Sequence, residues 1–245
     1  MKVSETCPLF LTDLHLYDFE ACYWNILKRM DYDLDDIPFE NKKERNIAIG
    51  KLQSQDPRLA QHLYKVAEDL VSEFIYRNNL KEEDVIVRQR DGLITKRRLE
   101  ETTLPSGIEF KKRASLSFII IARDRRKFLY RDQDGKIVVK GVPFLYDEMR
   151  QYFQRFSSLN FLSKRTLCSQ LQSLRDDLEK QSVATFCIPN EDESVSIFLI
   201  GEGQIVLSRR SIRLISKKNI DFNRYFDHYF RPFTESLFIE LIRRK

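Results

Sequence analysis

A chain of 245 residues is long enough for one large domain or two small ones, with a buried core. Its 42% of hydrophobic and 12% of aromatic residues exclude a disordered chain, and its net charge of +5 indicates a polyanionic partner. The sequence contains no apolar run as long as a membrane span and no signal-peptide pattern, so we expect a cytoplasmic, intracellular protein with no membrane partner.

The first part of the chain alternates strand-like and helix-like patterns. In chain order we expect a strand over 14–22, a helix over 23–30, an acidic connection over 31–41 and a helix over 42–53. Pro57 then suits the first turn of a long helix from about Arg58 to Asn78. One face of this helix carries apolar residues three or four positions apart, namely Leu59, Leu63, Val66, Leu70 and Phe74.

The middle of the chain predicts a hairpin followed by a second group of strands. Residues 85–90 and 93–97 form two strands around a tight turn at Asp91 and Gly92. After a break at 104–107, strands are expected over 114–122, 127–131 and 136–140. The remainder predicts helices within 145–181, two strands over 194–200 and 204–208, and a terminal helix near 231–244.

Charge and cysteine are distributed unevenly. Residues 13–36 hold seven acids against two bases, 111–140 hold ten bases against three acids, and 206–218 hold five bases and no acid. An acidic pocket for metal beside basic tracks for phosphate suits a nucleotidyl transferase, and ordinary patchiness of a basic surface is the alternative. The four cysteines are scattered without a CxxC pair, which excludes a recognisable zinc site.

Three short segments carry the functional prediction. They read YDFEACYWNIL at 17–27, KKERNIAIG at 42–50 and VRQRDGLI at 87–94. In order and spacing they resemble the DxxSLYPSI, KxxxNSxYG and YxDTDSI motifs of family B DNA polymerases. The third segment retains the second Asp of its motif as Asp91, whereas Gln89 replaces the first.

The resemblance implies phosphoryl transfer with two divalent ions, Mg²⁺ or Mn²⁺. Asp18 and Asp91 would be the catalytic carboxylates and metal ligands, on neighbouring strands, and the backbone carbonyl of Phe19 would be a further ligand. Each aspartate taken alone is equally typical of a strand end or a turn.

The same motifs imply a nucleotide site. Tyr23 would lie beneath the deoxyribose, and Lys42 and Asn46 would face the triphosphate of an incoming deoxynucleoside triphosphate. The alternatives are an aromatic core residue at Tyr23 and a solvated helix face at Lys42 and Asn46.

A fourth, basic segment resembles the KKRY and KG region with which the family holds the primer-template backbone. The residues that would contact nucleic acid are Lys111, Lys112, Arg113 and Lys140. Phosphate contacts of this kind give affinity and register without reading sequence. A solvated basic surface is the alternative.

The resemblance implies an α+β fold: an antiparallel polymerase-type palm sheet backed by helices, then a helical thumb-like region and a small C-terminal α/β segment. We expect a palm-like domain over 1–143 and a thumb-like and C-terminal segment over 144–245. Between Asp18 and Lys42 there are 23 residues, too few for the family's helical fingers, and no segment before the first motif could hold a proofreading exonuclease.

Two functions follow as expectations. The first is a minimal DNA polymerase, or one part of a split polymerase, that acts on a DNA primer-template at a nucleoid or a viral replication site. The second is a catalytically reduced polymerase-like subunit that binds nucleic acid or a partner replication chain. An unrelated α+β domain is a third and weaker interpretation.

Overall fold

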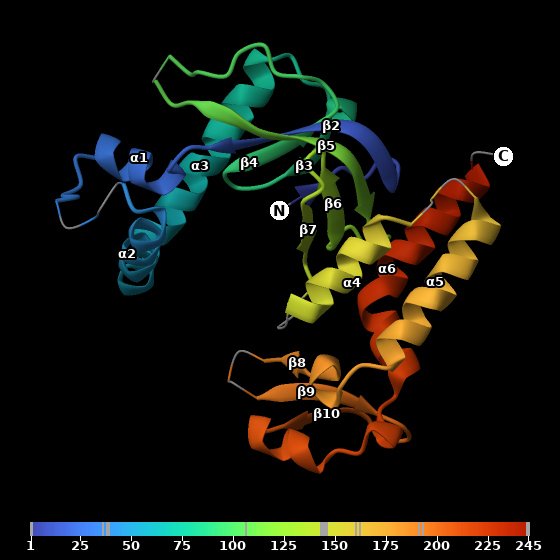
Figure 1. Cartoon of the computed structure of the whole chain (residues 1–245). Coiled ribbons are helices and arrows are strands. Elements are labelled where there is room, and N and C mark those ends of the chain that lie inside the picture. Colours follow the sequence, from blue (N-terminus) through green and yellow to red (C-terminus); the bar gives the residue numbers. More distant parts are fainter. Residues whose placement is uncertain are drawn as a thin grey trace. The chain divides into compact units, whose positions relative to one another are not determined.

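The computed structural model describes residues 2–35, 37, 40–105, 107–142, 147–159, 161, 163–190, 192 and 194–243, with the backbone alone for 147–150 and 189. The chain forms two compact units (Figure 1). The first consists of residues 1–7 and 13–116, and the second of residues 8–12 and 117–245. None of the helices in the described part combines the length and the apolar character that crossing a bilayer requires.

Seven strands form one antiparallel sheet. Its strands lie in the order β1-β3-β4-β2-β5-β6-β7. Their bounds are β1 Lys2–Val3, β2 Phe10–Phe19, β3 Val85–Arg88, β4 Gly92–Thr95, β5 Phe110–Ile121, β6 Phe128–Asp132 and β7 Ile137–Lys140. The central strands β2 and β5 are long enough to contribute to both units. The predicted α+β fold with an antiparallel sheet backed by helices is confirmed.

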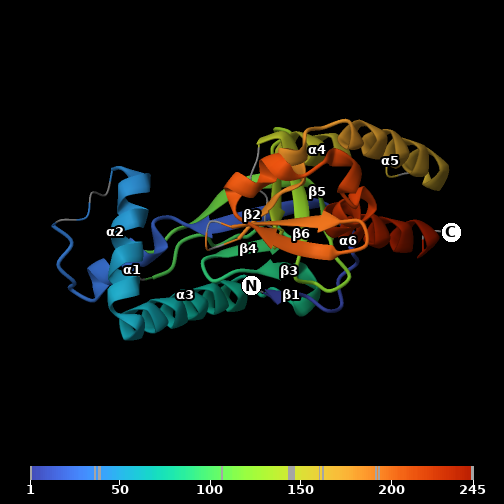
Figure 2. The ribbon, with the colours of Figure 1, turned by 90° about the horizontal axis from the view of Figure 1, so that it is seen from below.

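Three helices belong to the first unit: α1 (Cys22–Arg29), α2 (Lys42–Gln55) and α3 (Pro57–Arg77). They contact one another, as Figure 2 shows. Asp56 begins α3, because its carboxylate accepts hydrogen bonds from the backbone N–H groups of Arg58 and Leu59 at 2.9 and 3.1 Å. A short 3₁₀ turn, Glu82–Asp84, then leads into β3.

The buried face of α3 covers the sheet. Phe74 on this helix lies 5.4 Å from the ring of Phe19 on β2 and 4.6 Å from that of Phe110 on β5. The predicted face is confirmed in part, since Leu59, Leu63 and Phe74 are buried while Val66 and Leu70 are half-buried. The buried stripe continues instead through Ala60, Ala67 and Val71.

The second unit packs helices on β6 and β7 and carries a sheet of its own. Its helices are α4 (Asp147–Ser157), α5 (Lys164–Glu179) and α6 (Phe222–Arg243). The small sheet has the order β10-β9-β8, with β8 Ile188–Pro189, β9 Val195–Leu199 and β10 Gly203–Leu207. Three 3₁₀ turns, at Val183–Phe186, Arg209–Leu214 and Lys217–Asn219, complete the unit.

Aromatic rings fill the core of the second unit. Phe153 on α4 contacts Phe230 and Phe233 on α6, with ring centroids 4.9 and 6.1 Å apart. This core also receives Phe118 and Leu129 from β5 and β6. The compact units divide within β5, because β6 and β7 pack with the C-terminal helices. The predicted domain boundary near residue 143 stays a prediction. The assignment of the parts as palm-like and thumb-like stays a prediction.

The terminal helix is longer than the sequence pattern indicated. We expected it from Arg231, whereas α6 begins at Phe222 and contains Pro232 within it. A proline inside a helix removes one backbone hydrogen bond, at a cost of about 3 kcal/mol. Burial of Tyr225, Tyr229 and Phe230 along one continuous face offsets that cost.

Candidate functional site

A cavity of about 610 Å³ opens in the first unit. Its walls come from the end of β2, α1, α2, the turn before β4, and β5. Seven of the residues predicted from sequence line it: Asp18, Phe19, Tyr23, Lys42, Asn46, Asp91 and Arg113. The fold thus gathers the three motifs, which are separated in the chain, around one hollow.

Strand pairing places the two predicted aspartates side by side. Asp18 on β2 lies opposite Gly92, the first residue of β4. The N–H of Phe19 donates to the carbonyl of Asp91 at 2.9 Å. The glycine permits this approach, because a Cβ at position 92 would lie 3.0 Å from the carbonyl oxygen of Tyr17. Asp18 lies on β2, whereas Asp91 lies in the turn that precedes the neighbouring strand β4, so the expectation that both lie on strands holds for Asp18 alone.

The electrostatics of the cavity are those of two carboxylates close together. Burial and then the negative charge of Asp91 raise the pKa of Asp18 to about 6, although Arg113 and Lys42 oppose the shift. Burial first, and then both aspartates, also raise the pKa of the Cys22 thiol. The carboxylates therefore create a negative field that a cation would relieve.

Tyr23 lies in α1 at the edge of this field. Burial, followed by the charge of Asp91, raises the pKa of its hydroxyl to about 12. Its ring meets that of Tyr64 edge-on at 5.8 Å, and the guanidinium of Arg90 lies 4.0 Å from the centroid of the Tyr64 ring. Tyr23 is therefore held as a neutral, half-buried phenol beside Asp91.

Helix α2 supplies the opposite wall with a stripe of polar side chains. Asn41 begins the helix, since its side chain accepts from the N–H groups of Lys43 and Glu44. The cavity-lining residues of α2 are Lys42, Arg45, Asn46, Ile49 and Gln53. Their spacing of three and four residues puts them on one helix face. Lys42 and Asn46 are exposed there, whereas Arg45 is 9% exposed.

The sequence analysis missed several residues of this site. Arg45 and Gln53 were detectable, because they continue the helical spacing that starts at Lys42. Glu20 follows Asp18 by two positions on an expected strand and therefore shares its face. Glu40 also lines the cavity, and it lies in the segment that the sequence assigns to a connection. We find no sequence signal that would have placed it.

The basic segment of β5 is divided between the two faces of the sheet. The Nε of Arg113 lies 3.5 Å from Oδ2 of Asp18, and Lys111 forms ion pairs with Glu20 and, at 3.7 Å, with Glu109. Lys112 points to the other face, because successive strand residues alternate. There its charge, after burial, helps to lower the pKa of His15. Lys112 is therefore not among the cavity residues.

Lys140 lies at the end of β7, in the second unit, and is exposed. The glycine that follows it has a structural explanation. Gly141 has φ of 78°, and a Cβ there would lie 2.5 Å from the carbonyl oxygen of Arg126. Gly141 thus allows the backbone after β7 to lie against that of Arg126. Lys140 does not line the cavity.

The donor set of the cavity suits a hard divalent ion that keeps water and substrate ligands. Mg²⁺ prefers oxygen and is often bound by one or two carboxylates together with phosphates. Asp18 and Asp91 are two such carboxylates. The Phe19 ring packs on Phe74 and Phe110, which leaves the backbone of Phe19 at the cavity wall. The described residues contain no group of three or more His, Cys, Asp or Glu arranged around one ion.

Comparison with known proteins finds similarity at the level of structure alone. No family model matches the chain, and no curated protein matches it. Among solved structures it is similar to the family B DNA polymerase of the hyperthermophilic archaeon Pyrobaculum calidifontis, with a TM-score of 0.45 and 12% sequence identity. The match covers 96% of this chain and 46% of that polymerase. A similarity at this level assigns neither an activity nor a site residue to the chain.

Proposed function

We propose that the cavity of the first unit binds divalent metal ions and a nucleoside triphosphate, and that the protein transfers the nucleotide to a DNA primer. One observation carries the proposal: Asp18, Asp91, Tyr23, Lys42 and Asn46 come from three separate segments and line one cavity. That cavity holds paired carboxylates on one side and cationic and amide side chains on the other.

Each residue of the cavity has a role that its chemistry supports. Asp18 and Asp91 hold the metal ions, together with the backbone at Phe19. When bound, the metal activates the attacking hydroxyl and stabilises charge on the phosphates. Lys42 places a point charge on phosphate oxygens, and Asn46, one turn further along α2, donates from its amide. The neutral phenol of Tyr23 bounds the space that remains for the sugar.

A binding module without catalysis is the second candidate, and one feature of the site favours it. Two acids of the cavity already have cationic partners within the chain, since Arg113 pairs with Asp18 and Lys111 with Glu20. In addition, Gln89 occupies the position at which the family's motif carries a further carboxylate. A cavity of this kind would serve to bind nucleic acid or a partner replication chain.

Primer extension separates the two candidates. A labelled DNA primer-template is incubated with the four deoxynucleoside triphosphates and Mn²⁺ or Mg²⁺, using the wild type, Asp91→Asn and Lys65→Ala. Lys65 is an exposed residue of α3 outside the cavity, so its variant controls for handling and for charge. We expect slow extension by the wild type and by Lys65→Ala, and at least about 100-fold less by Asp91→Asn, because a metal ligand is lost.

Binding is measured on the same three proteins by fluorescence anisotropy. Asp91→Asn should bind primer-template at least as well as the wild type, since it removes a negative charge that repels phosphate. Equal extension by the wild type and Asp91→Asn would identify a contaminating polymerase. If none of the proteins extends the primer but DNA binding is retained, the polymerase proposal is wrong and the binding module is the better interpretation.

A further inference from the structure

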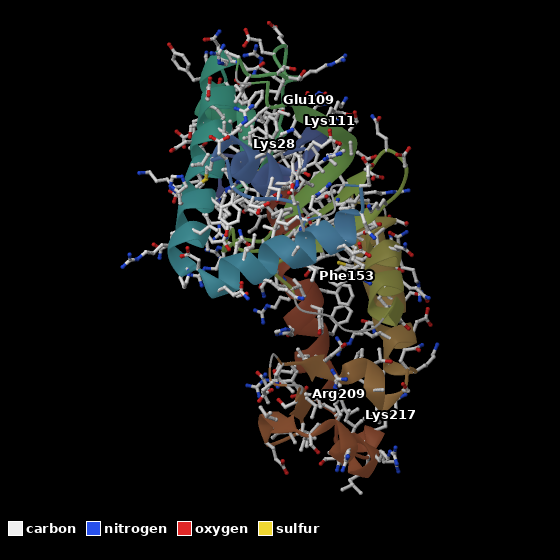
Figure 3. All side chains as sticks on the ribbon, turned by 90° about the vertical axis from the view of Figure 1, so that its left-hand side faces the viewer. Lys28, Glu109, Lys111, Phe153, Arg209 and Lys217 are labelled. Atoms are coloured by element: carbon white, nitrogen blue, oxygen red, sulfur yellow. The ribbon has the colours of Figure 1, made fainter. Side chains whose placement is uncertain are left out.

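Two cavity acids at the end of β2 are matched by bases of the neighbouring strand β5. Asp18 lies on β2 and Glu20 directly follows the strand, while Lys111 and Arg113 lie two positions apart and share one face of β5. The pairs are Lys111 with Glu20 and Arg113 with Asp18. Figure 3 shows Lys111 beside Glu109, its second partner. The basic residues on this face of β5 therefore offset part of the negative charge of two cavity acids before any ligand enters.

The ion pair between Arg113 and Asp18 is weak enough for a metal ion to replace Arg113 as the partner of Asp18. Its atoms are 3.5 Å apart, and the side chains are 38% and 37% exposed. Ion pairs in such a setting contribute little stability, because water screens them and the arginine must give up rotational freedom. A divalent ion binding to Asp18 replaces a single charge by a double one, and Arg113 is then released without a large cost.

We propose that Arg113 is a built-in competitor for the metal ion at Asp18, and that the phosphate backbone of nucleic acid removes it. Guanidinium binds phosphate through paired hydrogen bonds, which a phosphate offers and a carboxylate shared with a metal does not. Metal binding to Asp18 and phosphate binding to Arg113 are then mutually favourable. The cavity takes up its metal fully when nucleic acid is present. This inference rests on the proposed function.

Linkage makes the coupling reciprocal. If nucleic acid raises the affinity for metal by a given factor, metal raises the affinity for nucleic acid by the same factor. Without Arg113, the affinity for metal and the affinity for nucleic acid no longer depend on each other through this site. Removal of the arginine should therefore tighten metal binding in the absence of nucleic acid and abolish the gain that nucleic acid brings.

The test measures Mn²⁺ binding directly, with no activity readout. Isothermal titration and the electron paramagnetic resonance signal of free Mn²⁺ are recorded on the full chain for the wild type, Arg113→Ala, Arg113→Gln and Lys65→Ala. Each protein is titrated alone and with a short single-stranded DNA, and Mn²⁺ bound by the DNA itself is subtracted from a titration of DNA alone. Lys65→Ala removes the same charge outside the cavity. Far-ultraviolet circular dichroism confirms that each variant is folded.

Without DNA, we expect Arg113→Ala and Arg113→Gln to bind Mn²⁺ about 5-fold more tightly than the wild type and Lys65→Ala. DNA should tighten binding by a similar factor in the wild type and in Lys65→Ala, and leave both Arg113 variants unchanged. Equal Mn²⁺ affinity of the wild type and the Arg113 variants overturns the competition but leaves the metal site and the proposed function standing. Absence of Mn²⁺ binding in every protein overturns both.

Discussion

The two units of this chain place a carboxylate in a protein interior in opposite ways. In the second unit, Glu240 on α6 is 8% exposed and accepts a hydrogen bond from the N–H of Leu9 at 3.0 Å, with Arg243 3.2 Å away. In the first unit, Asp18 is partly buried beside Asp91, and burial followed by this like charge raises its pKa to about 6, although Arg113 and Lys42 oppose the shift. A donor compensates the charge of Glu240, whereas the Asp18 site holds charge that its surroundings disfavour.

This difference indicates which carboxylate serves the fold and which serves a ligand. A buried charge that is hydrogen-bonded positions its own element, as Glu240 ties α6 to the residue before β2. Burial and the nearby charge of Asp91 disfavour the ionised form of Asp18, which a bound cation would relieve, and groups perturbed in this way gather at functional sites. The following changes test this comparison, in order of their expected effect on stability.

The largest effect comes from emptying the two cores. Phe74→Ala in the first unit and Phe230→Ala in the second should each lower the free energy of unfolding by about 3–5 kcal/mol, because each leaves a cavity among aromatic rings. We expect Phe74→Ala to weaken Mn²⁺ binding as well, since Phe74 supports Phe19 beside Asp18, and Phe230→Ala to leave it unchanged. Urea denaturation and Mn²⁺ titration measure both. Loss of Mn²⁺ binding in a folded Phe230→Ala protein would contradict the division of roles between the units.

A smaller but clear effect is expected where the backbones of β6 and β7 converge. Gly141→Ala should destabilise the protein by about 1–3 kcal/mol, because residue 141 has a positive φ and its Cβ would lie 2.5 Å from the carbonyl of Arg126. The matched control is Gly50→Ala on α2, where a Cβ meets nothing within 4 Å. That change should raise stability by about 0.5–1 kcal/mol through helix propensity. The melting temperatures of both variants are compared with that of the wild type. An increase for Gly141→Ala would refute the steric explanation.

Removal of the carboxylate charge should have opposite effects on stability at Asp18 and at Glu240. The folded pKa of Asp18 is about 6, above its ordinary value of 3.8. Between about pH 4 and 6 the folded state keeps a proton that the unfolded state has released, so stability falls as pH rises through this range. Above pH 6 the loss is complete. Asp18→Asn should therefore stabilise the protein at pH 7.5, by about 1 kcal/mol after solvent screening is taken into account, and should have no such effect at pH 4.

Glu240→Gln is the matched control, a carboxylate-to-amide change in the other unit. It should lower stability at pH 7.5, because a charge-assisted hydrogen bond to Leu9 and the pair with Arg243 are weakened. Melting temperatures of the wild type and both variants at pH 4 and 7.5 provide the measurement. If the two variants shift stability in the same direction at pH 7.5, the contrast between the two carboxylates is wrong.

The smallest effect on stability is expected at the basic segment that follows β10. Figure 3 shows Arg209 and Lys217 in this segment, which carries five cations, namely Arg209, Arg210, Arg213, Lys217 and Lys218. The double variant Arg209→Ala/Arg213→Ala should leave the free energy of unfolding unchanged. If the segment contacts nucleic acid, the slope of log affinity against log salt should fall by about 0.7–0.9 per lost phosphate contact. An unchanged slope would restrict DNA contacts to other parts of the chain.

Much of the local structure follows from the sequence because it depends on neighbouring residues. Asp56 and Pro57 fix the start of α3 through a side-chain cap and a preset φ, and both are adjacent to the helix that they begin. The turn at 89–91 likewise joins two strands that are adjacent in the sequence, although Gly92, which the sequence placed in the turn, is the first residue of β4. The motif residues of the cavity could be found for the same reason, since each motif is confined to one strand end, one helix turn or one hairpin.

Tertiary structure alone decided which of these residues meet. The contact between Arg113 and Asp18 depends on β5 pairing beside β2, and the separation of Lys112 from the cavity depends on the register of that pairing. The extent of α6 through Pro232 depends on aromatic rings contributed by α4 and leucines contributed by α5. These contacts depend on the free energies of burial and strand pairing, summed over segments that are distant in the chain. Local propensity determines where helices and strands form. Which of them pack together is determined by the free energy of burial and strand pairing in the folded core.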